Sequence, residues 1–405
     1  ETAQLIRRAM ATHLAPGAPL LAETGGLNAM IVDSTALPEQ AVRDVVASSF
    51  QSAGQRCSAL RCLYVQADIA AHFTDMLFGA MEELSVGDPW ALSTDVGPVI
   101  DAEAEAGIRA HIEKARREGR LLRQLSTPRG GHFVAPSVIR VKGIGEMKRE
   151  IFGPVLHLAT FEAEDLQKVI ADINSTGYGL TFGLHTRIDN RVQEITEALR
   201  VGNIYVNRNQ IGAVVGSQPF GGEGLSGTGP KAGGPDNLPR IPTPAPGEGA
   251  GTPEGDADPA KVQAALAAAP GRKAIATHDL PGPTGESNRL TLTPRAPLLC
   301  LGPGPAAAEA QRKAVEALGG RAVALHGRLD PRALVGLTGF SGVLWWGDEA
   351  TARNLALALA DRDGPILPVI TAMPDRAHVA HERHVCVDTT ASGGNAALLA
   401  EAGSA

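Results

Sequence analysis

The feature that most constrains this chain is the alternation of short apolar runs with segments of helical periodicity. Ala29–Val32, Cys62–Val65 and Gly202–Asn207 have the length and composition of buried strands. Residues 42–50 and 166–173 place apolar side chains three and four positions apart, as in helices that pack on a sheet. Strands and helices that alternate in this way form a mostly parallel sheet with crossover connections. The sequence therefore predicts an α/β fold.

The first 24 residues are expected to contain one helix and one strand. Apolar side chains recur at helical spacing over residues 2–14. Pro19–Glu23 is a short, mostly apolar run that ends just before the turn residues Gly25-Gly26, so we expect a strand there. In that case Glu23 would lie at the carboxyl edge of a sheet, where open α/β folds usually place their ligands.

A second α/β pattern follows a change in composition. Residues 235–260 are rich in proline and glycine and contain few apolar side chains, which indicates either a linker or an ordered but irregular strap. After them, Leu298–Leu301, Ala322–Leu325 and Val343–Trp345 are expected to be strands. A helix is expected between the first two of these runs, ending near Leu318.

Composition and charge exclude several classes of protein. Of the 405 residues, 37 are Lys or Arg and 44 are Asp or Glu, a net charge of −7, so the chain lacks the basic surface typical of a nucleic-acid binder. No run approaches the roughly 20 apolar residues of a membrane helix, and the N-terminus lacks the pattern of a signal peptide. With 47 glycines and 4% aromatic residues, we interpret the chain as a loop-rich α/β enzyme.

The cysteines and histidines do not indicate a metal site. Four cysteines in a chain of this length form no disulfide framework, which favours a reduced, cytosolic setting, and none are paired as CxxC. His378, His381 and His384 recur at every third position, but this spacing is more typical of a solvated segment than of a metal-binding face. We therefore predict no metal.

Gly54-Gln55-Arg56-Cys57-Ser58 is the most informative stretch of the sequence. A cysteine that follows a helix, on a turn that starts with glycine, can direct its sulfur and its own backbone N–H at the same atom. This arrangement suits nucleophilic attack on a carbonyl group, because the N–H stabilises the oxyanion that forms. Taken alone, a buried and inert cysteine is the more common alternative.

Three further segments carry candidate side chains. Glu23 could act as a general base toward water if it is partly desolvated; the alternative is a solvated or arginine-paired carboxylate. Glu150, two residues before Phe152, suits an acceptor for ribose hydroxyl groups beside a stacking surface, or else belongs to a turn that enters a strand. The glycines in Pro219–Gly227 allow close backbone approach, which favours a loop that shapes a pocket.

Together these segments resemble the aldehyde dehydrogenase superfamily. The motifs Glu-Thr-Gly-Gly, Gly-Gln-Arg-Cys, Glu-Ile-Phe-Gly-Pro and Pro-Phe-Gly-Gly occur in that order over residues 23–222. Residues 52–59 and 215–234 are similar to the glutamate-semialdehyde dehydrogenase half of bifunctional proline utilization A proteins. Residues 280–288 and 388–396 resemble the C-terminal segments of the same proteins.

The resemblance implies a role for four of the candidate residues. Cys57 would be the nucleophile that forms a hemithioacetal with the aldehyde and, after hydride transfer to NAD, a thioester. Its backbone N–H would supply half of the oxyanion hole. Glu23 would activate the water that hydrolyses the thioester. Glu150 would bind the ribose on the nicotinamide side of NAD, with Phe152 packed near the nicotinamide.

The resemblance also implies a substrate site. Gly212, Ala213 and Ser58 align with the loop and the serine that anchor the α-carboxylate and the amino group of the substrate. Because the family often has a serine where Ala213 stands, we expect a backbone contact there rather than a hydroxyl contact. Phe220 aligns with an aromatic wall beside the aliphatic part of the substrate.

Several elements of the family pattern are not in this sequence. They are the glycine-serine-threonine-glutamate turn of the cofactor domain, the lysine that binds the adenosine ribose, and the asparagine of the oxyanion hole. Because the chain also starts at Glu1 within a predicted helix, we expect it to be a piece of a longer polypeptide that is inactive alone. We expect four parts: a remnant of the dinucleotide-binding domain (1–33), an aldehyde dehydrogenase catalytic domain (34–234), a Pro/Gly-rich linker (235–260) and a C-terminal, Rossmann-like α/β domain (261–405).

The C-terminal α/β domain contains a second motif that resembles a nucleotide site. Gly302-Pro303-Gly304-Pro305-Ala306-Ala307 follows a predicted strand and formally fits the dinucleotide fingerprint. Pro303 and Pro305 lack the backbone N–H groups that a pyrophosphate would need, so we interpret this domain as structural. By resemblance, it would cover the dehydrogenase site and help seal a tunnel for the intermediate.

The leading prediction is NAD-dependent oxidation of L-glutamate γ-semialdehyde to L-glutamate in proline catabolism. Two alternatives stay open: another semialdehyde dehydrogenase, and a noncatalytic lid or oligomerisation domain. The resemblance further implies a cytoplasmic homodimer with no nucleic acid among its partners. FAD and peripheral membrane association would belong only to an upstream proline dehydrogenase part, and the choice between NAD and NADP is not fixed.

Overall fold

The computed structural model describes residues 2–242, 245, 247–269, 271 and 273–390. These residues form two compact units. The first unit comprises the described residues up to Thr24, together with Pro219–His278 and Leu290–Arg383. The second unit comprises Gly25–Gln218, Asp279–Arg289 and the described residues from His384 onward. Residues 391–396 of the predicted tail motif lie outside the described part of the chain.

A mostly parallel sheet forms the centre of the second unit. Its order is β16-β8-β7-β1-β2-β5-β4-β3, and β11 and β10 follow beyond β16. Every pairing given for the strands from β16 to β4 is parallel, whereas β3 pairs antiparallel with β4. The strands are β1 (Ala29–Val32), β2 (Cys62–Gln66), β3 (Leu121–Gln124), β4 (Ser137–Arg140), β5 (Val155–Phe161), β7 (Thr181–His185), β8 (Asn203–Val206), β10 (Ala276–Leu280), β11 (Glu286–Pro294) and β16 (Ala380–Asp388).

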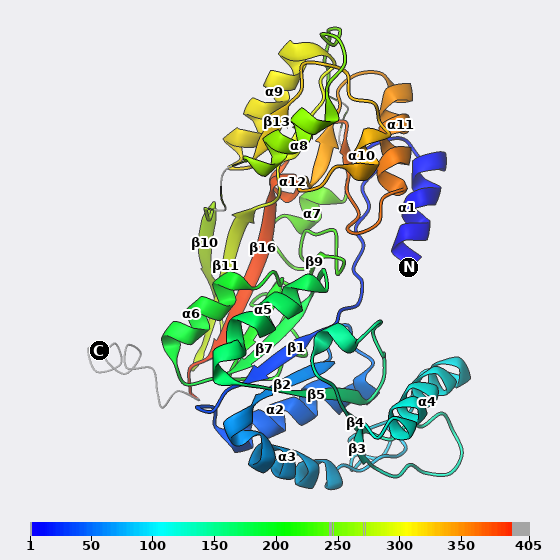
Figure 1. Cartoon of the computed structure of the whole chain (residues 1–405), viewed down its shortest axis with the longest axis vertical. Coiled ribbons are helices and arrows are strands. Elements are labelled where there is room, and N and C mark those ends of the chain that lie inside the picture. The colour runs from blue at the N-terminus through cyan, green and yellow to red at the C-terminus, as the bar shows by residue number, and fades with distance from the viewer. Residues whose placement is uncertain (1, 243–244, 246, 270, 272, 391–405) are drawn as a thin grey trace, which may run out of the picture. The chain divides into compact units, whose positions relative to one another are not determined.

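Strand β1 shows why this sheet is covered on both faces. All four of its residues are buried, and successive side chains point to opposite sides. Met30 and Val32 pack in one core with helices α2 (Pro38–Phe50) and α3 (Ala67–Glu82), whereas Ala29 and Ile31 pack in a second core with α5 (Leu166–Ser175) and α6 (Asp189–Ala198). Figure 1 shows these two helix pairs on opposite sides of the sheet. The expected parallel α/β sheet is therefore confirmed.

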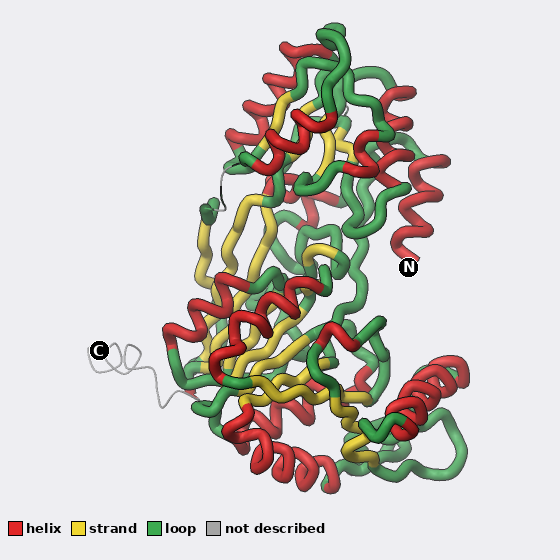
Figure 2. The backbone as a smooth tube through the Cα atoms, in the orientation of Figure 1, coloured by secondary structure: helices red, strands yellow, loops and turns green. Residues whose placement is uncertain are grey.

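The first unit contains a smaller parallel sheet in the order β13-β12-β14-β15. Helix α9 (Gly304–Ala317) contributes to the core on one face, and α11 (Glu349–Ala360) to the core on the other. Helix α1 (Thr2–His13) packs against α11. Figure 2 shows these short strands between helices. The strands are β12 (Leu298–Cys300), β13 (Ala322–Ala324), β14 (Gly342–Leu344) and β15 (Val369–Ile370).

The remaining elements are short or peripheral. None of the helices in the described residues has the length and apolar composition that crossing a bilayer requires. These elements are α4 (Ala102–Arg117), α7 (Asn237–Arg240), α8 (Pro259–Ala267), α10 (Ala333–Gly336), α12 (Arg376–Val379), β6 (Tyr178–Gly179), β9 (Glu223–Gly224) and the 3-10 turns Gln51–Gly54, Ile144–Glu146 and Ala163–Asp165.

The strand expected over Pro19–Glu23 does not form, so that prediction is wrong. Glu23 makes only an isolated antiparallel bridge with Gly227. The reason is visible one residue earlier, where the N–H of Ala22 donates to the hydroxyl of Thr228 at 2.9 Å instead of to a backbone carbonyl. The Thr228 hydroxyl thus accepts the hydrogen bond that a backbone carbonyl would accept in a regular β-ladder.

Part of the Pro/Gly-rich region is an ordered strap. The N–H of Gly247 donates to the carbonyl of Thr371 at 2.7 Å, and the N–H of Gly249 donates to the carbonyl of Trp346 at 3.1 Å. A Cβ atom at Gly247 would lie only 2.7 Å from the Trp346 ring. Of the two alternatives for this region, the described residues 247–249 therefore fit the strap.

Candidate active site

Cys57 follows a strained turn at the end of helix α2. Ser52, Ala53 and Gly54 have φ values of 57°, 53° and 65°, so three consecutive residues adopt the left-handed conformation. This conformation costs energy for residues other than glycine, and such strain often accompanies functional sites. At Gly54 a Cβ atom would also lie 2.2 Å from the carbonyl oxygen of Gly153, so the position requires glycine.

Cys57 differs from the other cysteines in exposure. It is exposed, whereas Cys62, Cys300 and Cys386 are buried. Burial raises the pKa of Cys300 and Cys386 to about 12, and it raises the pKa of Cys62 further. Because the thiolate is the reactive form of cysteine, the three buried thiols are poor nucleophiles and only Cys57 is accessible to a substrate.

Asn28 holds the turn from the side of the sheet. Its Nδ2 donates to the carbonyl oxygens of Cys57 at 2.7 Å and Ala59 at 2.9 Å, and its Oδ1 accepts from the N–H of Thr181 at 3.2 Å. The side chain is buried and both ends of its amide are used. This residue was not predicted from the sequence, because its role depends on segments far apart in the chain.

Arg61 joins the Cys57 turn to the segment that contains Glu150. Its side chain is completely buried. Nη1 donates to the carbonyl of Gly54 at 2.7 Å, and Nη2 donates to the carbonyl of Arg56 at 3.0 Å. Nε and Nη2 both donate to Oε1 of Glu150, at 3.1 and 3.0 Å. The sequence reasoning missed Arg61, although an arginine next to the buried apolar run Cys62–Val65 was a usable signal.

Glu150 and Phe152 both contact this guanidinium group. The pKa of Glu150 is raised by burial, against the opposing effect of Arg61 and an N–H donated by Gly26. A Cβ atom at Gly25 would lie 1.9 Å from Oε2 of Glu150, so the backbone can approach the carboxylate only because that residue is glycine. The Phe152 ring is 45% exposed, with its centroid 5.1 Å from Cζ of Arg61. An open aromatic face beside a fixed carboxylate suits a flat ring joined to a sugar.

Ser58 and the loop at residues 211–218 also belong to the second unit. Ser58 is buried, and its carbonyl accepts from Thr181 Oγ1 at 3.1 Å and Gln210 Nε2 at 3.2 Å. Gly212 is exposed with φ of 71°, and a Cβ atom there would lie 3.7 Å from Nη1 of Arg56. The loop therefore runs beside the Cys57 turn, and a guanidinium group lies next to Gly212.

Glu23 lies in the first unit, at the loop that contains Phe220. Its carboxyl oxygens face Gly221 and Gly227, each 3.4 Å from the position that a Cβ atom would take. Although Glu23 is an exposed residue, the loss of water around its carboxyl group raises its pKa to about 7. Lys231 and the N–H of Gly222 oppose this rise.

Lys231 is the cation whose charge opposes the rise in the pKa of Glu23. The lysine is buried, and its Nζ donates to the carbonyl of Gly221 at 2.5 Å. Burial lowers the pKa of Lys231 to about 7, against the attraction of Glu382 and Glu23. Phe220 pairs with Ala232 on the same loop, with N–H to carbonyl distances of 3.0 and 2.8 Å. Lys231 lies in the segment 215–234 that resembles the family, but the sequence did not indicate a role for it.

The structure thus brings six of the eight predicted site residues into one unit. Within the described residues there is no group of three His, Cys, Asp or Glu side chains that could hold a metal ion. Glu23 and Phe220 are the two site residues of the first unit. The six residues of the second unit are Cys57, Ser58, Glu150, Phe152, Gly212 and Ala213.

Comparison with known proteins gives two groups of relatives. The bifunctional protein PutA of Salmonella typhimurium is 42% identical over 462 residues, covering 98% of this chain and 35% of the relative, and PutA of Escherichia coli is 43% identical with the same coverage. The 1-pyrroline-5-carboxylate dehydrogenase of Bacillus cereus is 37% identical over 222 residues, covering 54% of this chain. The chain spans about a third of the length of these PutA relatives.

Solved structures and a family model complete the comparison. A crystal structure of a bifunctional proline utilization A protein matches with a TM-score of 0.58 and 54% identity, covering 59% of this chain and 24% of that one. A 1-pyrroline-5-carboxylate dehydrogenase from Thermus, solved with bound NAD, matches with a TM-score of 0.54 and 36% identity, covering 59% of this chain and 47% of that one. The model of the aldehyde dehydrogenase family matches residues 1–241. The chain belongs to the aldehyde dehydrogenase family.

Proposed function

We propose that this chain is part of a proline-catabolic enzyme that oxidises L-glutamate γ-semialdehyde to L-glutamate with NAD through a thioester on Cys57. The observation that carries the proposal is the environment of Cys57. Among the four cysteines, all of which lie in the described residues, it alone is exposed, and its turn is held by Asn28 and Arg61. The relatives named PutA and 1-pyrroline-5-carboxylate dehydrogenase support this choice of substrate.

The proposed chemistry begins with attack of the Cys57 thiolate on the aldehyde carbon. A C–S bond forms, and the carbonyl oxygen becomes the alkoxide of a hemithioacetal, to which the N–H of Cys57 donates. Loss of a hydride from the same carbon restores the C=O bond and leaves a thioester; NAD, when bound, accepts this hydride with both of its electrons. Water that has lost a proton to the Glu23 carboxylate then adds to the thioester, and the thiolate of Cys57 leaves.

The residues of the second unit fit the nicotinamide end of NAD. Glu150 is fixed by Arg61 and presents a carboxylate, which suits the hydroxyl groups of a ribose. The glycine at position 25 leaves room for that carboxylate, and the exposed ring of Phe152 offers an apolar face. These observations support Glu150 and Phe152 as the residues that would hold the cofactor.

The anchor for the substrate is proposed at Gly212 and Ala213. Within the described residues the N–H groups of both donate to no acceptor, and consecutive N–H groups at a left-handed glycine form a site for an anion. Arg56 lies beside Gly212 and adds a positive charge. This arrangement suits an α-carboxylate, and we assign the ring of Phe220 to the aliphatic part of the substrate.

The proposal is tested by Cys57→Ala in the full-length protein. We expect NADH formation from glutamate γ-semialdehyde to be lost while circular dichroism stays unchanged, because the thiol contributes chemistry rather than packing. Cys300→Ala, at a buried thiol of the small sheet, is the control and should keep its activity. Normal NADH formation by Cys57→Ala would overturn the proposal and favour a noncatalytic role.

The alternative of another semialdehyde dehydrogenase is tested by substrate choice. Succinic semialdehyde carries a carboxylate but no α-amino group, and butanal carries neither. If the anchor at Gly212 and Ala213 selects an amino acid, kcat/KM for glutamate γ-semialdehyde should exceed the values for both other aldehydes. Equal values would contradict the proposed substrate.

We also propose a structural role for the part of the chain after residue 260. A Cβ atom at Gly249 would lie 3.0 Å from the Pro303 ring, so the strap lies against the start of the glycine-proline motif where a pyrophosphate would bind.

Residues 34–234 would form the catalytic domain of a cytoplasmic homodimer. Sedimentation of the full-length protein would test the dimer.

A further inference from the structure

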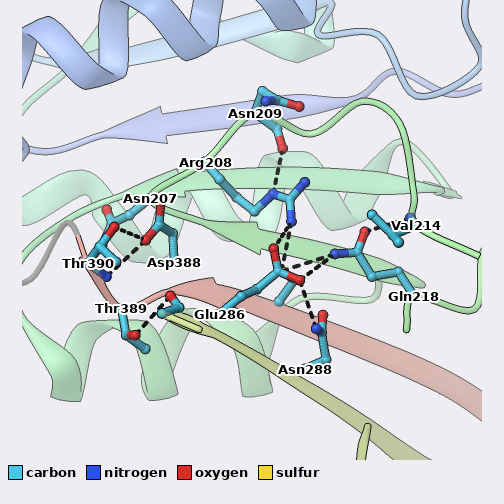
Figure 3. Close-up of polar contacts among 12 residues, drawn as sticks. Asn207, Arg208, Asn209, Val214, Gln218, Glu286, Asn288, Asp388, Thr389 and Thr390 are labelled. Carbon is cyan, nitrogen blue, oxygen red and sulfur yellow. Dashed lines mark hydrogen bonds and ion pairs between the residues drawn. The ribbon is translucent and has the colours of Figure 1, made fainter. Parts of the chain in front are cut away.

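We propose that Glu286 is a positioning residue that holds the loop at residues 211–218 in the shape that binds the substrate carboxylate. The inference rests on the proposed function of that loop as the substrate anchor. Glu286 lies on strand β11, far from the loop in sequence, and Figure 3 shows it among polar side chains from several segments. It contacts the loop through a hydrogen bond with Gln218.

The loop is closed by the side chain of Gln218. This side chain is buried, and its Oε1 accepts from the N–H of Val214 at 3.1 Å. The N–H groups of Ser217 and Gln218 donate to the carbonyl of Val214 at 3.2 and 2.9 Å, which completes a turn. Because Ala213 directly precedes Val214, the direction of its N–H depends on where Gln218 holds that turn.

Glu286 fixes the orientation of the Gln218 amide. Nε2 of Gln218 donates to Oε1 of Glu286 at 3.0 Å. If the amide were flipped, its NH₂ group would face the N–H of Val214 and its oxygen would face the carboxylate, and both contacts would be repulsive. The carboxylate of Glu286 thus selects the one orientation that closes the loop, which Figure 3 shows as a continuous path from Glu286 through Gln218 to Val214.

Glu286 is itself held by the surrounding side chains. Arg208 donates from Nη1 to Oε2 at 2.5 Å, and Asn288 donates from Nδ2 to Oε1 at 2.8 Å. The side chains of Glu286 and Arg208 are only 14% and 16% exposed, so this pair is weakly screened by solvent. The buried thiol of Cys386 also accepts from Arg208, at 3.2 Å. The path therefore starts from a carboxylate on strand β11 that several hydrogen bonds hold in place.

The test compares two aldehydes in Glu286→Gln of the full-length protein. We expect KM for glutamate γ-semialdehyde to rise about tenfold, the effect of weakening one hydrogen bond to a charged group, with kcat changed far less. For butanal, which has no carboxylate to anchor, kcat/KM should stay as in the wild type. A general structural defect would lower both activities together, and that result, or an unchanged KM, would overturn the inference.

Two further variants sharpen the test. Asp279→Asn removes an exposed carboxylate of the same segment, 87% exposed beside Arg289, and should change neither activity. Gln218→Met leaves the Arg208–Glu286 pair in place and should reproduce the selective rise in KM, even if Glu286→Gln does not fold. In the double variant the two effects should not add, because Glu286 acts through Gln218; additive effects would overturn the inference.

This result is separate from the test of the proposed function. If the wild-type protein does not oxidise glutamate γ-semialdehyde at all, the proposed function is wrong. If the wild type oxidises it and Glu286→Gln shows no selective rise in KM, the function stands and the positioning role of Glu286 is wrong.

Discussion

Two carboxylates, one in each unit, interact with their neighbouring cations in different ways. Glu150 accepts two hydrogen bonds from the completely buried guanidinium of Arg61. Glu23 is balanced by Lys231, and the pKa values of both groups are shifted to about 7. Arginine keeps its charge and fixes geometry, whereas a buried lysine readily changes its protonation state. This difference supports the proposed roles, in which Glu150 holds a ligand and Glu23 exchanges a proton with water.

The largest effect is expected when the carboxylate of Glu23, the proposed base, is removed. Glu23→Gln in the full-length protein should lower kcat about a thousandfold, because a glutamine cannot accept a proton from water. The first turnover should survive as a burst of NADH, since hydride transfer precedes hydrolysis of the thioester. Rapid-mixing kinetics would measure both phases.

A matched variant controls for the loss of a carboxylate as such. Glu316→Gln, on the surface of helix α9, should leave both phases unchanged. A steady-state rate for Glu23→Gln within a few-fold of the wild type would contradict the role of Glu23 as a base. The proposed difference in role between Glu23 and Glu150 would then be wrong.

The second-largest effect is expected when the ion pair between Arg61 and Glu150 is broken. Arg61→Met should destabilise the protein by about 3–5 kcal/mol, because it leaves the largely buried Glu150 carboxylate without its cation. Urea unfolding measures the change. Arg109→Met, which removes the exposed partner of Glu105, should leave the free energy of unfolding nearly unchanged. Similar values for the two arginine variants would show that Arg61 does not hold Glu150 in the way described.

The smallest effect concerns the pH dependence of the rate. A positive charge on Lys231 lowers the pKa of Glu23, so Lys231→Met should raise that pKa further. Because Glu23 must be deprotonated to accept a proton, the rise of kcat with pH should move toward alkaline pH, by about one pH unit. Lys231→Arg, which keeps a positive charge, should leave the rise near its original pH. A shift toward acid pH in Lys231→Met would reverse the assignment.

The sequence predicted the elements whose pattern is local. The helices over residues 2–14 and 42–50 and the strands at Ala29–Val32 and Cys62–Val65 form within a few residues of their expected bounds. Each has a periodicity that can be followed along one segment. The strand over Pro19–Glu23 failed because the hydroxyl of Thr228, about 200 residues away, takes the place of a backbone partner.

The sequence motifs predicted the residues of the candidate site, but not the residues that hold them in place. The exposed Cys57 turn and the Glu150 segment were found because their residues are neighbours in sequence. Asn28, Arg61 and Glu286 were missed because each acts on segments that only the folded sheet brings to it. A buried polar side chain can be noticed in a sequence, but its partners follow from topology.

The pairing of β16 with β8 has a consequence for the synthesis of the protein. His384 pairs with Asn203, so the edge of β8 obtains its neighbour only after roughly 180 further residues have been added. At about 5–20 residues per second, translation leaves that edge open for about 10–40 s. An unpaired strand edge is a site for contact with other chains. The nascent protein therefore exposes the edge of β8 to other chains while residues 207–380 are made, and a chain released before residue 380 would keep that edge exposed.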